Sequence, residues 1–108
     1  MFKDRETAEE AKFAHTEETR FRIRARRDKL FGEWAARRLG LEPGAAESYA
    51  RALVTDFEPD RDHALQERVR HDLDRAGKDA SHEEIATAFV AAALEAERQI
   101  AAELGSKP

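Results

Sequence analysis

The stretch "TRFRIRARR", residues 19–27, decides the fold class, because it can be read as a strand or as a helix. Apolar residues alternate with arginines here, and this alternation is typical of a half-buried β-strand. At 100° per residue of an α-helix, however, Leu30 and Trp34 fall within about 20° of Ile23. The alternation also ends at "RRDK", whereas the helical stripe continues. We therefore predict a helix, in which Phe21 lies about 200° from Ile23, away from the core stripe.

The C-terminal stretch predicts a long helix. Ser81 and Glu84 have the spacing of a capping box, so the helix is expected to start at about His82. Gly105 provides a stop at its end. The interior "FVAAALEA" is small and apolar nearly all round, so we expect this helix to pack against more than one neighbour.

Two shorter helices are predicted in between. One is entered at the Pro-Gly step of residues 43–44 and closed by Pro59. The next has Asp60 or Asp62 as its cap and Gly77 as its terminator. Four helices with short connections predict an all-α four-helix bundle. The predicted core residues are Leu30, Phe31, Trp34, Ala35, Leu39, Ala46, Tyr49, Ala50, Leu53, Val54, Phe57, Leu65, Val69, Leu73, Ala76, Ile85, Phe89, Ala92, Ala96, Ile100 and Leu104.

The N-terminal segment differs from the rest. Residues 1–20 are half charged and offer little to bury besides Phe2 and Phe13. Ordering the backbone costs roughly 1–2 kcal/mol per residue, whereas each phenylalanine returns about 2–3 kcal/mol if fully buried. We therefore predict a mobile, largely disordered segment over residues 1–20 and a four-helix domain over residues 21–108. The two phenylalanines, three helical turns apart, would share a face if the segment folded on a partner.

Composition limits the possible functions. A chain of 108 residues is expected to form one domain. It has no cysteine, which excludes disulfides and thiol nucleophiles. No apolar run approaches the roughly 18 residues of a membrane span, and the charged N-terminus is no secretory signal, so we expect a cytoplasmic protein without membrane insertion.

No motif in the chain indicates catalysis, a cofactor or a metal. The loop "DFEPDRDHALQE" has the outline of a calcium-binding EF-hand, but Arg61 stands at the sixth position, where the sharp turn normally requires glycine. No glycine-rich phosphate loop is present. We expect no catalytic residue, no bound cofactor and no metal. Histidines without metal-ligand spacing stand at positions 15, 63, 71 and 82.

A basic block has three possible interpretations. Residues 20–38 carry eight positive and two negative charges in a chain of net charge −4. Arg22, Arg26 and Lys29 form an outer row on the predicted helix, which can be a solvated face, a docking surface for an acidic protein, or a phosphate contact. The alternative function is therefore a basic-helix nucleic-acid or nucleotide-binding module. The pI of about 5.6 argues against it, because dedicated nucleic-acid binders usually exceed a pI of about 9.

Residues 12–41, "KFAHTEETRFRIRARRDKLFGEWAARRLGL", closely resemble the zeta subunit of the alphaproteobacterial F-type ATP synthase, its inhibitor subunit. "DFE" at residues 56–58 and "VRHDLDRAG" at residues 69–77 also resemble this family, in the same order. The resemblance implies a four-helix bundle with a mobile inhibitory N-terminal segment. In such proteins the segment enters a catalytic interface between α and β subunits, reaches the rotating γ subunit, and blocks rotation in the hydrolytic direction.

The resemblance also implies a regulatory, non-enzymatic role. The expected partners are the α, β and γ subunits of the ATPase head, with no nucleic acid, at the inner face of the inner membrane. His15 lies in the segment, so its titration near neutrality would tune binding. The implied partner-binding residues are Phe2, Arg5, Glu9, Lys12, Phe13, His15, Arg20, Phe21, Arg22 and Arg24.

Overall fold

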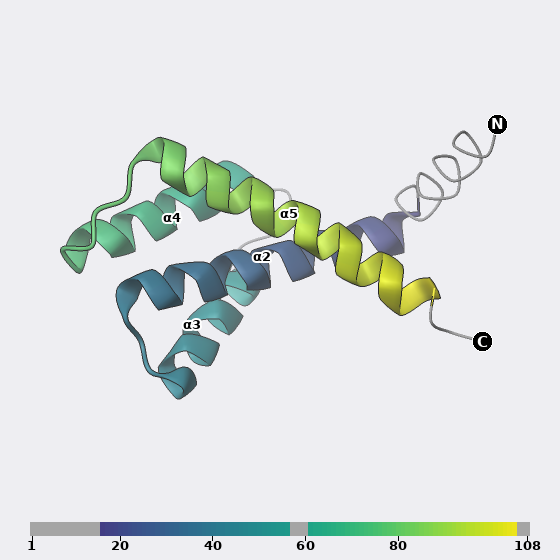
Figure 1. Cartoon of the computed structure of the whole chain (residues 1–108), viewed down its shortest axis with the longest axis horizontal. Coiled ribbons are helices and arrows are strands. Elements are labelled where there is room, and N and C mark those ends of the chain that lie inside the picture. The colour runs from purple at the N-terminus through teal and green to yellow at the C-terminus, as the bar shows by residue number, and fades with distance from the viewer. Residues whose placement is uncertain (1–15, 57–60, 106–108) are drawn as a thin grey trace.

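The computed structural model describes residues 16–56 and 61–105 of the chain, and these contain four α-helices and no strand (Figure 1). The prediction of an all-α four-helix bundle is confirmed, as is the choice of helix over strand for residues 19–27. The helices are α2 (Glu17–Leu39), α3 (Pro43–Asp56), α4 (Asp62–Arg75) and α5 (His82–Gly105).

Helix α2 is the common partner of the other three helices, each of which packs against it (Figure 1). Ion pairs at both ends show that α2 and α5 run antiparallel. Near the start of α2, Arg22 and Arg26 bind Glu103 close to the end of α5. Near its end, Arg38 binds Glu84 in the first turn of α5. Helix α5 also packs against α4, which confirms that it has more than one neighbour.

The helix ends follow the side chains expected to cap them, with one exception. Ser81 and Glu84 form the predicted capping box, with bonds of 3.0 and 3.2 Å between each side chain and the other's backbone N–H. Thr16 caps α2 by accepting a bond from the Thr19 backbone N–H, so this helix begins upstream of the predicted segment boundary at residue 20. The exception is α4, for which Asp60 or Asp62 was predicted as the cap. Asp62 is instead the first residue of the helix, Arg61 stands at the cap position without a side-chain hydrogen bond, and Asp60 lies outside the described residues.

Aromatic rings from two helices form the centre of the core. Phe31 is fully buried, stacks on Trp34 with ring centres 5.8 Å apart, and meets the edge of Phe89 at 5.2 Å. The predicted core is confirmed in most positions, but Ala76 is exposed because α4 ends at Arg75. Phe57 lies outside the described residues. The core cluster comprises Phe31, Ala35, Leu53, Leu65, Val69, Leu73, Ala80, Ile85, Phe89 and Ala92.

A buried arginine joins three helices. Arg27, on α2, donates to Asp28 on the same helix at 2.8 Å and to Asp62 of α4 at 2.8 and 3.3 Å. Its guanidinium also lies 4.5 Å from the centre of the Phe89 ring of α5. Arg27 and Asp28 are only 7% and 2% exposed. The carboxylate of Asp62, predicted as a helix cap, therefore serves instead as a partner for this arginine.

Burial of Asp28 makes its ionisation sensitive to the fold. Desolvation raises the pKa of this carboxyl above its usual value of 3.8, and the hydrogen bond and charge of Arg27 oppose the rise. Because the pKa of this carboxyl is higher in the folded than in the unfolded protein, its protonation stabilises the fold at pH values below the unfolded pKa. This stabilisation is lost as the pH rises through the folded pKa. When Asp28 is ionised, its buried charge therefore depends on Arg27 for compensation.

Gly32 marks the closest approach of α2 and α3. A Cβ atom at this position would lie 2.9 Å from the Cα atom of Ala50 and 3.2 Å from a methyl carbon of Leu53. Because the nearer obstacle is backbone, the two helices would have to move apart to accept any side chain.

We predict that Gly32→Ala destabilises the protein by about 1–3 kcal/mol, the usual cost of overpacking, although alanine favours a helix by up to about 1 kcal/mol. The matched control is Gly44→Ala in α3, where a Cβ meets nothing within 4 Å. Urea unfolding monitored by circular dichroism measures both. Equal stability of the two variants would contradict the proposed close contact.

We also predict that Arg27→Met lowers the free energy of unfolding by roughly 3 kcal/mol at neutral pH, since it leaves the buried Asp28 carboxylate uncompensated. The loss should shrink at about pH 4, because protonation of Asp28 removes the unpaired charge. The double variant Arg27→Met/Asp28→Leu should recover most of the stability at neutral pH. Urea unfolding at both pH values measures the free energy of unfolding. A loss of stability that does not depend on pH would exclude the Asp28 carboxylate as its cause.

Candidate partner-binding surface

Four of the predicted partner-binding residues lie in the described structure, on the first two turns of α2. Arg20 and Phe21 are exposed, whereas Arg22 and Arg24 are half-buried. Phe21 is 55% exposed, as expected from its angle to the core stripe. The six others lie outside the described residues: Phe2, Arg5, Glu9, Lys12, Phe13 and His15.

The predicted outer row of basic residues is not a uniform solvated face. Arg26 contacts Glu103 of α5 at 2.7 Å and donates to Gln99 at 2.8 Å. Arg22 reaches the other carboxylate oxygen of Glu103 at 3.4 Å. Lys29, in contrast, is exposed. The arginines of this row therefore help to fix α5 against α2, and only Lys29 presents its charge outward.

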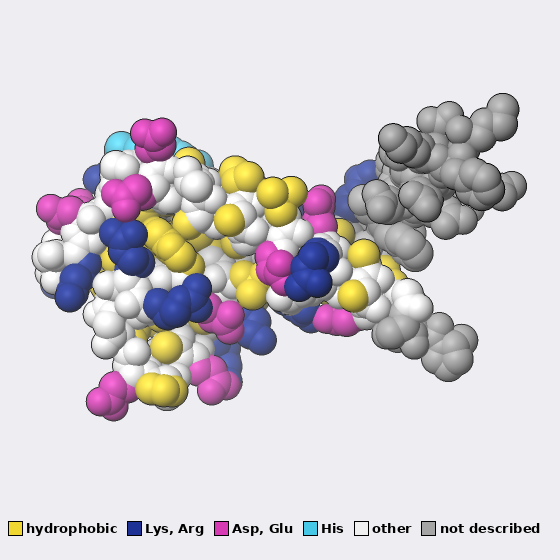
Figure 2. Space-filling view, viewed as in Figure 1, with side chains coloured by type: hydrophobic (Ala, Val, Ile, Leu, Met, Phe, Trp, Pro, Cys, Tyr) yellow, Lys and Arg dark blue, Asp and Glu magenta, His cyan; other side chains and the backbone are white. Residues whose placement is uncertain are grey.

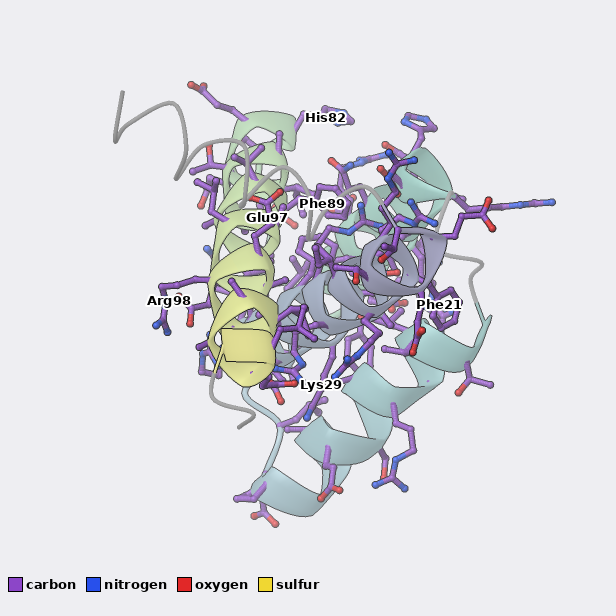
Figure 3. All side chains as sticks on the ribbon, turned by 90° about the vertical axis from the view of Figure 1, so that its right-hand side faces the viewer. Phe21, Lys29, His82, Phe89, Glu97 and Arg98 are labelled. Atoms are coloured by element: carbon purple, nitrogen blue, oxygen red, sulfur yellow. The ribbon has the colours of Figure 1, made fainter. Side chains whose placement is uncertain are left out.

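A groove of about 440 Å³ lies between α2 and α3 and extends to the end of α5. Figure 3 shows Phe21 and Lys29 on the part of α2 that borders this groove. Apolar, basic and acidic side chains line it. The sequence did not indicate this groove, because Val54 on α3 was assigned to the core. The lining residues are Phe21, Arg22, Ala25, Arg26, Lys29, Glu33, Glu47, Ala50, Arg51, Val54, Thr55 and Ile100.

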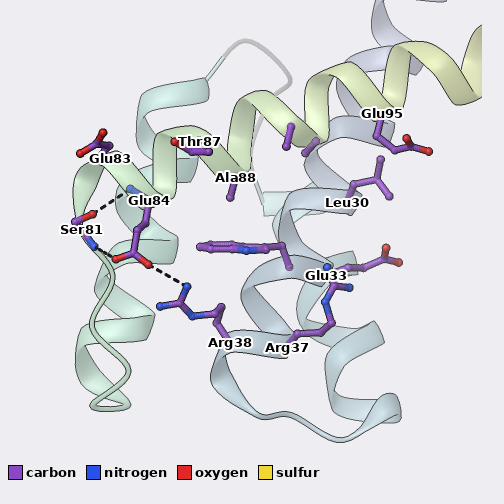
Figure 4. Close-up of a pocket in the computed structure, with 13 residues that line it drawn as sticks. Leu30, Glu33, Arg37, Arg38, Ser81, Glu83, Glu84, Thr87, Ala88 and Glu95 are labelled. Carbon is purple, nitrogen blue, oxygen red and sulfur yellow. Dashed lines mark hydrogen bonds and ion pairs between the residues drawn. The ribbon is translucent and has the colours of Figure 1, made fainter.

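A second groove, of about 720 Å³, lies between α2 and the first half of α5 (Figure 4). Its floor includes the ring of Trp34, with the Arg38 guanidinium 5.4 Å from the ring centre. Arg38 also donates to Glu84 at 3.2 Å, and Glu84 accepts from the Ser81 backbone. The Ser81 backbone N–H and then Arg38 lower the pKa of Glu84. The polar groups at this end of the groove are therefore paired with one another.

No group of side chains that could hold a metal ion appears in the part of the chain that the structure describes. His63, His71 and His82 are all exposed. The Nδ1 atom of His82 lies 3.8 Å from a carboxylate oxygen of Glu67. Glu67 itself binds Arg70 at 3.0 Å, and Asp62 binds Arg27. Two carboxylates of the EF-hand-like stretch thus serve as ion-pair partners within the bundle.

Hydrophobic side chains are also exposed along α5 (Figure 2). Val90 and Leu94, one turn apart, are 56% and 63% exposed. Among the described helices, none is long and apolar enough to cross a membrane. Val90 and Leu94 thus form a short apolar stretch on the exposed face of α5.

Residues 1–99 match the family model described as ATPase inhibitor subunit zeta. The chain belongs to this family. The match confirms the resemblance seen in residues 12–41 and covers the N-terminal segment, the first three described helices and most of α5. No curated protein and no solved structure was found to match the chain.

Membership of the zeta family sets the coarse function. The family is one of ATPase inhibitor subunits, which implies a regulatory role and an ATP synthase as partner. The described surface agrees with a binding role, because its grooves combine exposed apolar side chains with charged rims.

We predict that Phe21→Ala changes the free energy of unfolding by less than about 1 kcal/mol, because the ring is largely in solvent already. Phe89→Ala, which removes a ring only 9% exposed, should cost about 3–5 kcal/mol. Urea unfolding of the two variants measures this difference. A comparable loss for both would mean that Phe21 serves the fold and not a binding surface.

Proposed function

We propose that this zeta-family chain inhibits ATP hydrolysis by the F-type ATPase head, by inserting its N-terminal segment (residues 1–20) at an α/β catalytic interface close to the γ rotor. The observation that carries the proposal is the extent of the family match, which begins at residue 1 and so includes this segment. The bundle then serves as the folded part from which the segment extends.

The start of α2 suits this role. Helix α2 is already formed at Glu17, and adding residues to an existing helix avoids the cost of nucleation. Upstream extension of α2 on the target would give up the Thr16 cap, which is worth about 1 kcal/mol. Burial of Phe2 and Phe13 against the target would return more than this. The segment is therefore expected to fold as a continuation of α2 when the ATPase head supplies the missing surface.

The alternative, a basic-helix nucleic-acid or nucleotide-binding module, is less well supported. It depends on arginines such as Arg22, Arg26 and Arg27 contacting phosphates. All three side chains make ion pairs within the bundle, with Glu103 or Asp62 as partner. Steeply salt-dependent DNA or RNA binding, weakened by substitution of these arginines, would support the alternative.

The decisive test removes the segment without touching the cap. We predict that the full chain inhibits ATP hydrolysis by the purified ATPase head and that deletion of residues 1–15, which keeps Thr16, abolishes inhibition. Circular dichroism should show the same thermal unfolding of the helices in both proteins, since the described core lies in residues 16–105.

A matched pair of variants separates side-chain contact from chain length. Phe2→Ser/Phe13→Ser in the full chain should lose most of the inhibition, because the two rings are the main apolar surface of the segment. Leu94→Ala, which truncates an exposed apolar residue on α5, should inhibit as the unmodified chain does. Full inhibition by the deletion form would rule out the segment as the inhibitory element.

A further inference from the structure

The α2–α3 groove presents apolar surface that the fold itself leaves open. Phe21 stands at its edge, more than half exposed, with the half-buried Val54 of α3 as its apolar counterpart. Ala25 and Ala50 keep the floor between them shallow and free of large side chains. An aromatic ring beside a shallow apolar floor is the kind of anchor that dominates protein–protein contacts, where aromatic residues are enriched.

The rim of this groove carries an excess of positive charge. Of the charged residues that line it, Arg22, Arg26, Lys29 and Arg51 are basic and Glu33 and Glu47 are acidic, although the whole chain has a net charge of −4. Arg51 pairs with Glu47. Arg22 and Arg26 share the carboxylate of Glu103. Lys29 is exposed, and no ion pair joins it to any other residue of the described chain. The groove therefore combines an apolar floor with a cation whose charge is not yet matched.

The position of the groove ties it to the inhibitory segment. Phe21 follows Thr16 by five residues, which is about 7.5 Å along a helix axis. A protein surface that contacts the segment just upstream of Thr16 is therefore within reach of Phe21 and Lys29. Residues on the far side of the bundle, such as the exposed Val90 of α5, have no such proximity in sequence to the segment.

From this geometry we infer that the α2–α3 groove is a second docking surface, which binds an acidic helix of the ATPase head. The helix places an apolar side chain against Phe21 and Val54 and a carboxylate beside Lys29, as an amphipathic helix does in a hydrophobic groove. The identity of the partner rests on the proposed function. The segment then supplies inhibition, whereas the groove adds affinity and orients the segment.

The test compares two double variants of the full chain. Each truncates one exposed apolar side chain to alanine and replaces one exposed lysine with glutamate, on different surfaces. Phe21→Ala/Lys29→Glu alters the groove. Leu94→Ala/Lys78→Glu truncates an apolar side chain that is at least as exposed as Phe21 and reverses the charge of an exposed lysine elsewhere. Binding to the purified ATPase head is measured on a biosensor surface, and inhibition of ATP hydrolysis is measured in parallel. Circular dichroism verifies that both variants are folded.

We expect the groove variant to bind about tenfold more weakly or worse, with a matching rise in the half-inhibitory concentration, because an aromatic anchor and a charge contact are both lost. The control variant should bind as the unmodified chain does. Lys29→Arg should retain binding, and Lys29→Glu alone should weaken it, which identifies the charge as the cause.

The other outcomes separate the groove inference from the proposed function. Equal binding by the groove and control variants would leave the proposed inhibition standing and remove the groove from it. Tighter binding by the groove variant would mean that the groove holds the chain's own N-terminal segment before the head binds. If the unmodified chain binds the head without inhibiting it, the proposed function fails, and the comparison of the variants still decides on the groove. If the chain does not bind the head at all, both ideas fail.

Discussion

The guanidinium of Arg27 is the contact on which the arrangement of the helices depends. It is the one side chain described here that meets a carboxylate on its own helix, a carboxylate on α4 and an aromatic ring on α5. Burying a charge without such partners would be costly. The three contacts therefore act together as a geometric constraint, because only one placement of α4 and α5 around α2 satisfies them all.

Around this centre the faces of α2 serve different purposes. Phe31 and Ala35 fill the core, Gly32 lets α3 approach, and Arg22 and Arg26 fix the end of α5. Once these demands are met, the first turns of α2 still leave Phe21 in solvent beside the groove. The helix that organises the fold is thus also the one that presents the candidate binding surface and that follows the N-terminal segment in the sequence.

Family membership and the physical character of the chain lead to the same division of labour. The N-terminal segment is predicted to have too little apolar surface to fold by itself, and it is joined to a bundle with a buried core of its own. In the proposed function, folding of the segment is coupled to binding, so the cost of ordering the segment reduces the net binding free energy. Specificity then depends on the partner surface against which the segment folds. A second contact from the bundle would offset part of that ordering cost.

Much of the fold could be predicted from the sequence. Helical spacing of apolar residues placed four helices, and the capping box at Ser81 fixed the start of the last one, because both signals are local. The role of Asp62 was missed, and Arg27 was read only as part of a basic block. Both errors have one cause: an ion pair between residues 35 apart depends on where the helices pack, which no local pattern encodes. The sequence by itself determined which residues are helical and that Phe21 faces away from the core. Only the tertiary structure decided which charged side chains are buried in pairs and which, like Lys29, remain available, because this depends on contacts between helices.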